Sequence, residues 1–334
     1  MLNKDSLQKI SAAINARKDL FDEQHQVALR LFNGFYEGLP TLVIDLFATT
    51  AVIHNYSRDP DSELDILAVK DLLKERLPWL AAVILKARNA QTAEEKNGTF
   101  VYGNRADRKV LEHEVWYAVD LRLNRDTSMY IDTRNLRRWA MDNLSGKTVL
   151  NAFAYTGTLG VAAIAGGAES VLQLDSNRSF LNIAKDSCSL NSFPVRKKDY
   201  RSGDFWAEVK ALKRAGTLFD CVLLDPPYFA ASRSGRIDLA KDSKSLINKV
   251  RPLIKDGGIL VAVNNALFVS GEDYMSDLNE LCRDGYLSIE TTINVSEDIT
   301  GYPATIVQKA PVDPAPFNHS TKIAVLRVKR KPVG

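Results

Sequence analysis

The chain has 334 residues, of which 45% are hydrophobic and 25% are charged, and its formal net charge is +3. These values fit a globular protein of about two domains, and no apolar run approaches the roughly 20 residues that cross a bilayer. Three widely spaced cysteines and four scattered histidines argue against a disulfide framework and against a metal site. We therefore expect a cytoplasmic protein without membrane association or bound metal.

The first third of the chain predicts a small α+β domain. Residues 5–33 have apolar side chains near helical spacing, which predicts an amphipathic helix. Two strand-like runs follow at 41–46 and 51–56, then a helical pattern at 64–85 that Pro78 interrupts. Further strands are expected at 100–102 and 115–120. We divide this part into an N-terminal helix over residues 1–33 and an α+β domain over residues 34–123, for which we expect a contact with the substrate.

From about residue 146 strands alternate with helices, the pattern of a parallel doubly wound sheet. The expected strands are 148–153, 170–175, 195–200, 220–224, 258–264, 287–295 and 323–328. The expected helices are 159–165, 178–191, 205–215, 243–254 and 272–284. Seven strands that end in an antiparallel pair give a Rossmann-like α/β fold of the methyltransferase type, which we assign to residues 124–334.

The first strand of this sheet runs into a turn of small residues before a helix. In an open α/β sheet this turn lies at the switch point where ligands bind. The sequence lacks G-x-G-x-x-G, which argues against a dinucleotide, whereas a single glycine suits a ligand with an amino-acid moiety. A tight turn without a ligand is the alternative interpretation. The residues expected at a cofactor here are Asn151, Phe153, Tyr155, Thr156 and Gly157.

Two acidic residues follow later strands of the sheet. Asp175 with Ser176 ends the second strand, where a carboxylate accepts hydrogen bonds from the ribose hydroxyls of an adenosine. Asp204 follows the third strand and could accept from the adenine amino group, with Phe205 packed on the ring. For each aspartate, capping of the next helix is the alternative.

The run Asp225-Pro226-Pro227-Tyr228 ends a strand of buried character. It is typical of enzymes that methylate nitrogen atoms of nucleobases. The prolines fix the backbone and present carbonyl acceptors without competing amides, and Tyr228 offers a face for an unpaired or flipped base. Together with the preceding motifs, this run predicts an S-adenosylmethionine-dependent methyltransferase with Asp225 in both the cofactor site and the catalytic site.

From about residue 30 to its end, the chain resembles the RNA methyltransferases of the large ribosomal subunit, which include cytosine-C5 enzymes and a guanine-N7 enzyme. Beyond the motifs above, the resemblance includes residues 30–33, 37–40, 43–45 and 126–137. It implies S-adenosyl-L-methionine as cofactor and 23S ribosomal RNA as partner, in a monomer or homodimer. It also implies that Tyr130 lies over the cofactor and that Asp132 and Arg134 brace its methionine end.

The chain departs from this family in two respects. Many members begin with an RNA-binding β-barrel of the PUA type, whereas here a helix is expected before the α+β domain. The family's Thr-Gly is Thr127-Ser128 in this chain, and a serine disfavours the backbone conformations that glycine permits.

The acceptor base is inferred from a further comparison with the family. A cytosine-C5 enzyme needs a cysteine that attacks C6 of the base, and Asn265 stands where the cytosine branch has that cysteine. The pair Asn264-Asn265 instead matches the guanine-N7 branch, in which amides orient the base and N7 needs only alignment with the methyl group. We therefore expect guanine N7 as the acceptor. The expected catalytic residues are Asp225, Pro226, Tyr228, Asn264 and Asn265.

Other functions stay open at this stage. Within the class, the acceptor could be an exocyclic amine of guanine or adenine, or cytosine C5. A nicotinamide-dependent oxidoreductase and a non-catalytic RNA-binding protein are alternatives from other classes, since fold alone does not decide function. Basic runs near the expected site suggest contacts with phosphates, although such runs are often solvated helix faces. Their residues are Arg134, Arg137, Arg138, Arg233, Arg236, Lys241, Lys244, Lys249, Arg251, Arg327, Lys329, Arg330 and Lys331.

Overall fold

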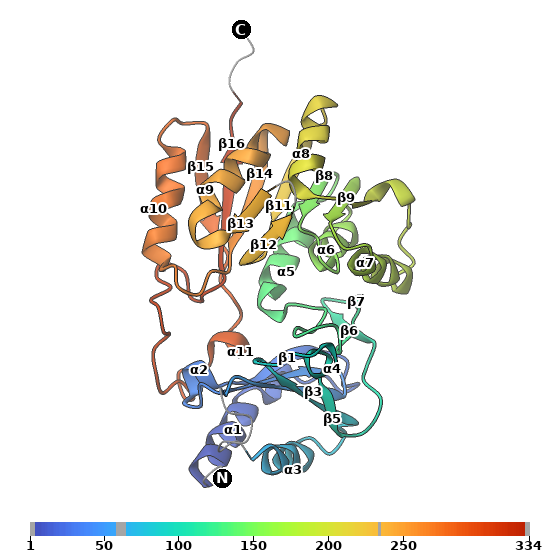
Figure 1. Ribbon diagram of the computed structural model, residues 1–334, viewed down its shortest axis with the longest axis vertical. Coiled ribbons are helices and arrows are strands. Elements are labelled where there is room, and N and C mark those ends of the chain that lie inside the picture. The colour runs from blue at the N-terminus through green and yellow to red at the C-terminus, as the bar shows by residue number, and fades with distance from the viewer. Residues whose placement is uncertain (1–3, 58–64, 233–234, 331–334) are drawn as a thin grey trace. The chain divides into compact units, whose positions relative to one another are not determined.

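The chain forms two compact units in the computed structural model, which describes residues 4–57, 65–232 and 235–330 without the side chains of residues 93, 94 and 232 (Figure 1). The N-terminal unit comprises Met1–Asp132 and Ser296–Pro311, and the C-terminal unit comprises Thr133–Val295 and Val312–Gly334. Within the described ranges, no helix has the length and apolar character needed to cross a membrane.

The N-terminal unit is built on a five-stranded sheet in the order β1-β2-β3-β4-β5. The strands are β1 (Ala28–Asn33), β2 (Leu42–Phe47), β3 (Thr50–Asn55), β4 (Ala82–Ala87) and β5 (Thr99–Tyr102). Helices α1 (Lys4–Ala16) and α3 (Ile66–Arg76) share one apolar core with this sheet. Shorter elements are α2 (Gly34–Glu37), α4 (Ala93–Asn97) and the pair β6 (Lys109–Glu112) and β7 (Val115–Ala118).

The expected helix over residues 5–33 is wrong after Ala16. The chain leaves the helix at Arg17 and passes through His25 with a φ of 53°, then enters β1. β1 pairs with β2 in antiparallel fashion, and most of its side chains are buried. Its apolar residues therefore belong to a sheet. The N-terminal helix therefore belongs to the α+β unit and is not a separate segment.

The expected helix over residues 64–85 is also wrong in its second half. Residue 64 lies outside the described ranges, and α3 ends at Arg76, two residues before Pro78. The run that follows Pro78 forms β4, which pairs in parallel with β3. β-branched Val83 and Ile84, both fully buried, suit a central strand better than a helix.

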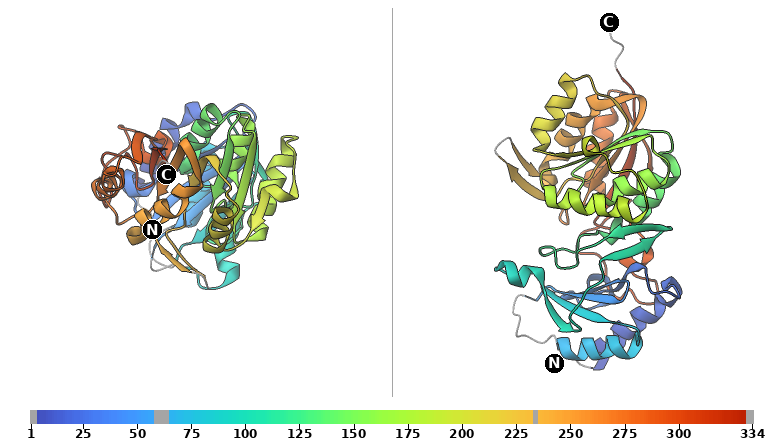
Figure 2. Two further views of the ribbon diagram at one scale, coloured as in Figure 1. Left: turned by 90° about the horizontal axis from the view of Figure 1, so that it is seen from above. Right: turned by 90° about the vertical axis from the view of Figure 1, so that its right-hand side faces the viewer.

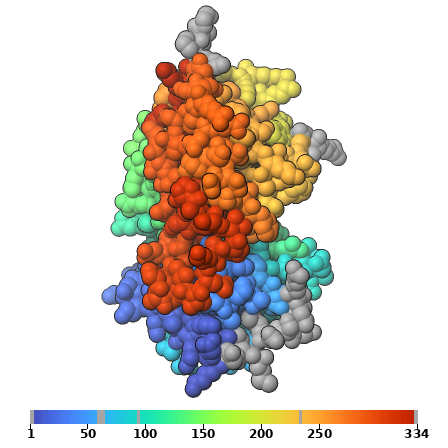
Figure 3. Space-filling model, turned by 90° about the vertical axis from the view of Figure 1, so that its left-hand side faces the viewer, coloured from blue at the N-terminus to red at the C-terminus, as the bar shows by residue number. Residues whose placement is uncertain are grey.

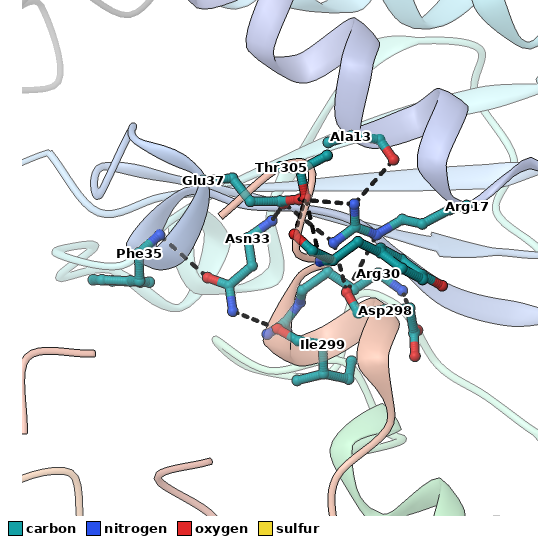
Figure 4. Close-up of polar contacts among 10 residues, drawn as sticks. Ala13, Arg17, Arg30, Asn33, Phe35, Glu37, Asp298, Ile299 and Thr305 are labelled. Atoms are coloured by element: carbon teal, nitrogen blue, oxygen red, sulfur yellow. Dashed lines mark hydrogen bonds and ion pairs between the residues drawn. The ribbon is translucent and has the colours of Figure 1, made fainter. Parts of the chain in front are cut away.

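A buried ionic cluster in the N-terminal unit holds a segment that returns from late in the sequence. The Arg17 guanidinium donates to the Glu37 carboxylate at 2.9 Å and to the carbonyl of Asp298 at 2.8 Å (Figure 4). Asp298 lies in α11 (Glu297–Thr300), and its carboxylate accepts the backbone N–H of Arg30. The division expected from the sequence placed residues 296–311 in the other domain. Figure 3 shows this orange-red segment beside the blue part of the same unit.

The C-terminal unit contains a seven-stranded sheet in the order β10-β9-β8-β11-β14-β16-β15, with β16 as the single antiparallel strand. The strands are β8 (Thr148–Ala152), β9 (Ser170–Asp175), β10 (Tyr200–Ser202), β11 (Phe219–Leu224), β14 (Ile254–Asn264), β15 (Leu287–Thr292) and β16 (Lys322–Val328). The Rossmann-like sheet expected from the sequence is confirmed. Its order reverses between β8 and β11, which is the switch point of the fold.

Side chains alternate between two apolar cores on the two faces of this sheet. Val149 and Leu223 point to a core that α5 (Arg134–Asn143) and α6 (Thr158–Ala165) cover. Leu150 and Leu224 point to a core that three further helices cover. These helices are α8 (Phe205–Arg214), α9 (Leu239–Val250) and α10 (Gly271–Cys282), while α7 (Arg178–Leu190) packs beside α6.

Three local features of the C-terminal unit differ from the expectation. The third strand is β10 at 200–202, whereas residues 197–199 form a turn of 3-10 helix. Helix α9 begins at Leu239, four residues before the expected start. Between β11 and α9, the chain forms a hairpin of β12 (Phe229–Ser232) and β13 (Gly235–Asp238), which was not expected because its residues show no apolar alternation beyond Ile237.

Candidate active site

The turn after β8 has an unusual backbone. Phe153 and Tyr155 have φ values of 58° and 51°, and Gly157, which precedes α6, has a φ of 74°. A Cβ on Gly157 would lie 2.4 Å from the Cβ of Ala184, so glycine is required there by both conformation and space. Strained backbone of this kind is frequent at functional sites because the surrounding structure must hold it in place.

Asp175 at the end of β9 holds this turn from the neighbouring strand. Its carboxylate accepts the backbone N–H of Tyr155 at 2.8 Å and that of Asn177 at 2.8 Å. Asn177 caps α7, so Asp175 does not take the capping role, and Ser176 beside it is exposed. Burial raises the pKa of Asp175. A carboxylate has about four acceptor positions, so these two backbone N–H groups and that of Ser176 still leave capacity for a ligand.

Aromatic rings line the next strand end. Phe153 stacks on Phe205 with ring centroids 4.4 Å apart. Asp204 caps α8 by accepting the backbone N–H of Ala207 at 3.0 Å, as the capping interpretation expected. Tyr155 meets the edge of Phe180 at 4.6 Å. The structure therefore brings Phe153, Asp175 and Phe205 to adjacent strand ends, as their places in the sequence suggested.

Asn151 lies in β8 before the turn, and Thr156 is a residue of the turn itself. Both side chains are about 1% exposed. The Asn151 amide donates to Gln173 at 2.7 Å, and Gln173 in turn donates to the carbonyl of Gly157 at 3.2 Å. The structure thus gives Asn151 a supporting position below the turn, through Gln173, which the sequence analysis did not single out.

The Asp-Pro-Pro-Tyr run leaves β11 at the carboxyl end of the sheet. Pro226 is buried, whereas Tyr228 is 45% exposed. The carbonyl of Tyr228 accepts the backbone N–H of Leu239, so the backbone is fixed where the side chain is open.

Asn264 and Asn265 end β14, the next strand of the sheet. Asn264 is 1% exposed and its side chain accepts the backbone N–H of Ala266, so it shapes the loop. The Asn265 amide donates to the carbonyl of Pro226 at 3.3 Å, and its buried Oδ1 has no partner within the described part of the chain. The structure brings Asn265 and Pro226 together, as expected for one site.

Three expected cofactor residues precede the seven-stranded sheet. Tyr130 is 45% exposed and donates a hydrogen bond to the Asp126 carboxylate at 3.3 Å. Tyr130 and Asp132 belong to the N-terminal unit, whereas Arg134 begins α5 of the other unit. At Ser128, the buried side chain accepts the backbone N–H of Asp120, and no positive φ occurs. The roles of Tyr130, Asp132 and Arg134 at the cofactor stay predictions.

The cysteines lie in or near the apolar cores. Cys188 and Cys221 are fully buried, and burial raises the pKa of all three thiols, including that of Cys282 on α10. Nucleophilic cysteines have thiols with lowered pKa values in electropositive, partly exposed surroundings. Within the described residues, the chain has no cysteine of that kind.

The basic residues of the expected runs differ in their surroundings. Lys244, Arg251 and Arg327 form ion pairs with acidic side chains of the same unit. Lys241 is exposed and forms a longer ion pair with Asp238 at 3.7 Å, and Arg236 is exposed. Arg233 and Lys331 lie outside the described residues.

The sequence matches the family of S-adenosylmethionine-dependent methyltransferases over residues 92–297. The chain belongs to this family. A Bacillus subtilis protein named as a ribosomal RNA large subunit methyltransferase, YwbD, is 33% identical over 279 residues, which are 78% of this chain and 66% of that protein. Ribosomal RNA large subunit methyltransferase I of Aeromonas hydrophila is 28% identical over 260 residues, 76% of this chain and 65% of that protein. The methyltransferase chain thus spans slightly less than two thirds of the length of these relatives.

The fold is also found among solved structures. SMU.776, a methyltransferase complexed with SAH, has a TM-score of 0.82 and 20% identity over 98% of this methyltransferase chain and 82% of its own. A methyltransferase from Streptococcus mutans has a TM-score of 0.80 at 19% identity over 98% of this chain and 82% of its own. At these identities the likeness establishes the fold alone. Membership of the family excludes the oxidoreductase alternative.

The residues at the switch point fit the cofactor of this family. The adenosyl group needs an acceptor for its ribose hydroxyls, and Asp175 places a half-buried carboxylate at the end of β9. The adenine needs an apolar face, and partly exposed Phe153, which stacks on the buried Phe205, supplies one at the next strand end. The N–H of Tyr155 in the turn donates to the Asp175 carboxylate, so the backbone of the turn lies beside the same strand end. The residue types at these strand ends therefore fit S-adenosylmethionine, and their contacts with it stay predictions.

Proposed function

We propose that this methyltransferase transfers a methyl group from S-adenosylmethionine to a base of large-subunit ribosomal RNA. The observation that carries the proposal is the hydrogen bond between Asn265 and the Pro226 carbonyl, because it joins the Asp-Pro-Pro-Tyr run to the next strand end. The names of the relatives support ribosomal RNA as the substrate class.

The cofactor supplies an electrophilic methyl group on a sulfonium centre when bound. The chain's own residues hold and orient the reactants. Asp175 would accept hydrogen bonds from the ribose, and Phe153, backed by Phe205, would pack against the adenine. Most of the rate enhancement then comes from alignment, because a correctly placed acceptor and methyl group react as if in one molecule.

Two side chains form the base side of the site: Tyr228 supplies a ring face, and Asn265 supplies a hydrogen-bond acceptor. Tyr228 has a half-exposed ring on a fixed backbone, which suits stacking of an unpaired base. Asn265 Oδ1 is a buried acceptor without a partner in the described residues, and such a group is costly unless a ligand satisfies it. Cytosine N4 and the N1 and N2 atoms of guanine each carry hydrogens that fit this acceptor.

The comparisons and the site favour different acceptor atoms. The expectation from the sequence was guanine N7. The large-subunit relatives favour cytosine C5 instead. Cytosine C5 is activated by a nucleophile that adds to C6. The second candidate, guanine N7, is favoured by the family resemblance that sets Asn265 at the position of that nucleophile, and by the burial of Cys188 and Cys221.

Nucleoside mass spectrometry of methylated RNA tests the proposal. Large-subunit ribosomal RNA from a strain that lacks the gene is incubated with the purified protein and isotope-labelled S-adenosylmethionine. Labelled 5-methylcytidine supports the first candidate, and labelled 7-methylguanosine supports the second. Absence of label from every RNA nucleoside, with a protein that binds the cofactor, contradicts the proposal.

A further inference from the structure

Two strand ends of the C-terminal unit expose large apolar side chains next to the proposed base site. Phe229 is 57% exposed after β11, and Leu267 and Phe268 are 60% and 77% exposed after β14. Single exposed apolar residues are ordinary on protein surfaces. A group of them at two adjacent strand ends, beside Tyr228, is a feature that indicates a binding surface.

The β12–β13 hairpin presents Phe229 on an open face. Cross-strand pairing and the alternation of side chains put Ala230 and Ile237 on one face, and both pack on the apolar core. Phe229, Ala231 and Arg236 occupy the opposite face, which is exposed. The hairpin projects from its unit in the right-hand view of Figure 2.

Two contacts hold the described backbone of β12 and β13, although their outer face is open. Gly235 lies against the Trp206 ring of α8, where an added Cβ would be 2.5 Å from Nε1. At its base, Tyr228 accepts the backbone N–H of Leu239. A fixed backbone with an exposed aromatic side chain loses little conformational entropy on binding, which favours recognition.

The loop after β14 is held in a similar way. Ala266 is fully buried, and its carbonyl accepts hydrogen bonds from the backbone N–H of Val269 and from the Lys322 ammonium. The first of these bonds closes a four-residue turn with Leu267 and Phe268 at its two central positions. Both side chains therefore point away from the unit's interior, which their exposure confirms.

The two segments belong to one edge of the sheet. Strands β11 and β14 are parallel neighbours, with Leu224 opposite Ala262. Just beyond these positions, Asn265 donates to the Pro226 carbonyl and ties the two loops together. Phe229 and Phe268 each follow this tie by three residues.

We propose that the outer face of the hairpin (Phe229, Ala231 and Arg236), together with Phe268, binds a nucleotide that flanks the methylated base in single-stranded RNA. This inference rests on the proposed function and names the form of RNA that the same site accepts. Aromatic faces stack on bases of any sequence, provided that the bases are not already stacked in a duplex. Arg236 is exposed on the same face, with Lys241 nearby in sequence, and supplies positive charge for the adjoining phosphate.

Fluorescence anisotropy with labelled oligouridine tests this surface in the full chain. We expect Phe229→Ala and Phe268→Ala each to weaken oligouridine binding by about ten-fold, within the range for the loss of one stacked base. Phe229→Trp should restore the affinity. Arg236→Glu should weaken binding and also lower the slope of log affinity against log salt by about one. Double-stranded RNA of the same length should bind more weakly than oligouridine.

Matched controls come from the opposite edge of the same sheet. Leu218→Ala removes an apolar side chain that is 37% exposed before β11, and Arg214→Glu reverses an exposed charge at the end of α8. Neither should alter oligouridine affinity, and all variants should bind S-adenosylmethionine as the wild type does.

The outcomes separate this inference from the proposed function. If the wild type methylates large-subunit RNA and the Phe229 and Phe268 variants bind oligouridine with unchanged affinity, the surface is not a nucleotide site. Equal affinity for duplex and single-stranded RNA would likewise overturn it. If the wild type transfers no methyl group to RNA while these variants still lose oligouridine binding, the proposed function fails and the surface stands.

Discussion

The ionic cluster of the N-terminal unit and the carboxyl edge of the seven-stranded sheet differ in how their polar groups are satisfied. Arg17 and Glu37, 0% and 1% exposed, satisfy each other and the carbonyl of Asp298. At the sheet edge, Asn265 keeps a buried acceptor without a partner in the described residues, and Tyr228 leaves half of its ring open. Both places have a firmly held backbone, so the difference lies in what the side chains contact.

This difference separates a structural role from a functional one. A buried charge is tolerated only when partners compensate its loss of water, so a closed cluster serves the fold that closes it. Arg30 and Asp45 in the same unit also form an ion pair, at 2.7 Å, in which each charge compensates the other. Burial by itself raises the pKa of Asp45, but the charge of Arg30 together with the hydrogen bonds from His54 and Arg30 outweighs this and holds the pKa well below its usual range. Groups that are fixed and still unsatisfied indicate a ligand that completes them.

The largest effect is expected in the ionic cluster. Arg17→Met should destabilise the protein by about 3–5 kcal/mol, because it leaves the Glu37 carboxylate buried without its partner. Urea unfolding followed by circular dichroism measures this loss. Lys9→Ala, which breaks an exposed pair with Asp5 on the same helix, should cost less than about 1 kcal/mol. A loss below about 1 kcal/mol in Arg17→Met would show that the cluster does not support the fold.

The next effect concerns the cofactor. Asp175→Ala should weaken S-adenosylmethionine binding by about ten- to a hundred-fold, since it removes a charged acceptor worth about 1.5–3 kcal/mol. Isothermal calorimetry measures the affinity. Asp186→Ala on the exposed face of α7 is the control. Because Asp175 also accepts the backbone N–H of Tyr155, thermal unfolding must show that the variant is folded. Unchanged affinity in a folded variant would remove the ribose assignment.

The sequence predicted the sheet better than it predicted the surroundings of the site. Strands such as β8 and β11 are largely apolar runs that end in turns. These local signals are sufficient to predict a strand. The first strand of the N-terminal unit was missed because Leu29 and Leu31 fit both a helical and a strand pattern. The contact of α11 with β1 joins residues about 270 positions apart, which no local pattern encodes.

The same limit applies within the candidate site. Tyr228 and Asn265 could be singled out as candidates because ligands bind at the carboxyl ends of the strands in such sheets. Phe229 was not singled out, since its exposure depends on the hairpin that turns its neighbours Ala230 and Ile237 into the core. Gln173 was missed because a polar residue inside an apolar strand has no local signal for the turn that it supports.

An effect of similar size is expected on the base side. Tyr228→Ala and Asn265→Ala should each slow methyl transfer by about ten- to a hundred-fold, as expected for loss of a stacked base or of its orienting bond. Cofactor affinity should stay unchanged, because neither side chain belongs to the adenosyl pocket. Single-turnover methylation and cofactor titration on the same preparations measure both quantities. Parallel loss of cofactor binding and transfer would show that these residues do not form a base pocket.

The burial of the cysteines predicts no effect of their replacement on methyl transfer, as guanine N7 as acceptor requires, and this is the sharpest test between the two acceptor atoms. A triple variant with Cys188, Cys221 and Cys282 replaced by alanine should bind S-adenosylmethionine and methylate RNA at close to the wild-type rate. The reason is that burial raises the pKa of each thiol, whereas attack on cytosine C6 needs a thiolate in the site. Replacing fully buried Cys221 lowers stability, so thermal unfolding and cofactor titration accompany the rate measurement. Three single variants serve as controls for that loss. If one single variant folds, binds the cofactor and transfers no methyl group, or if the wild type forms a covalent adduct with RNA, the protein uses a cysteine and acts on cytosine C5.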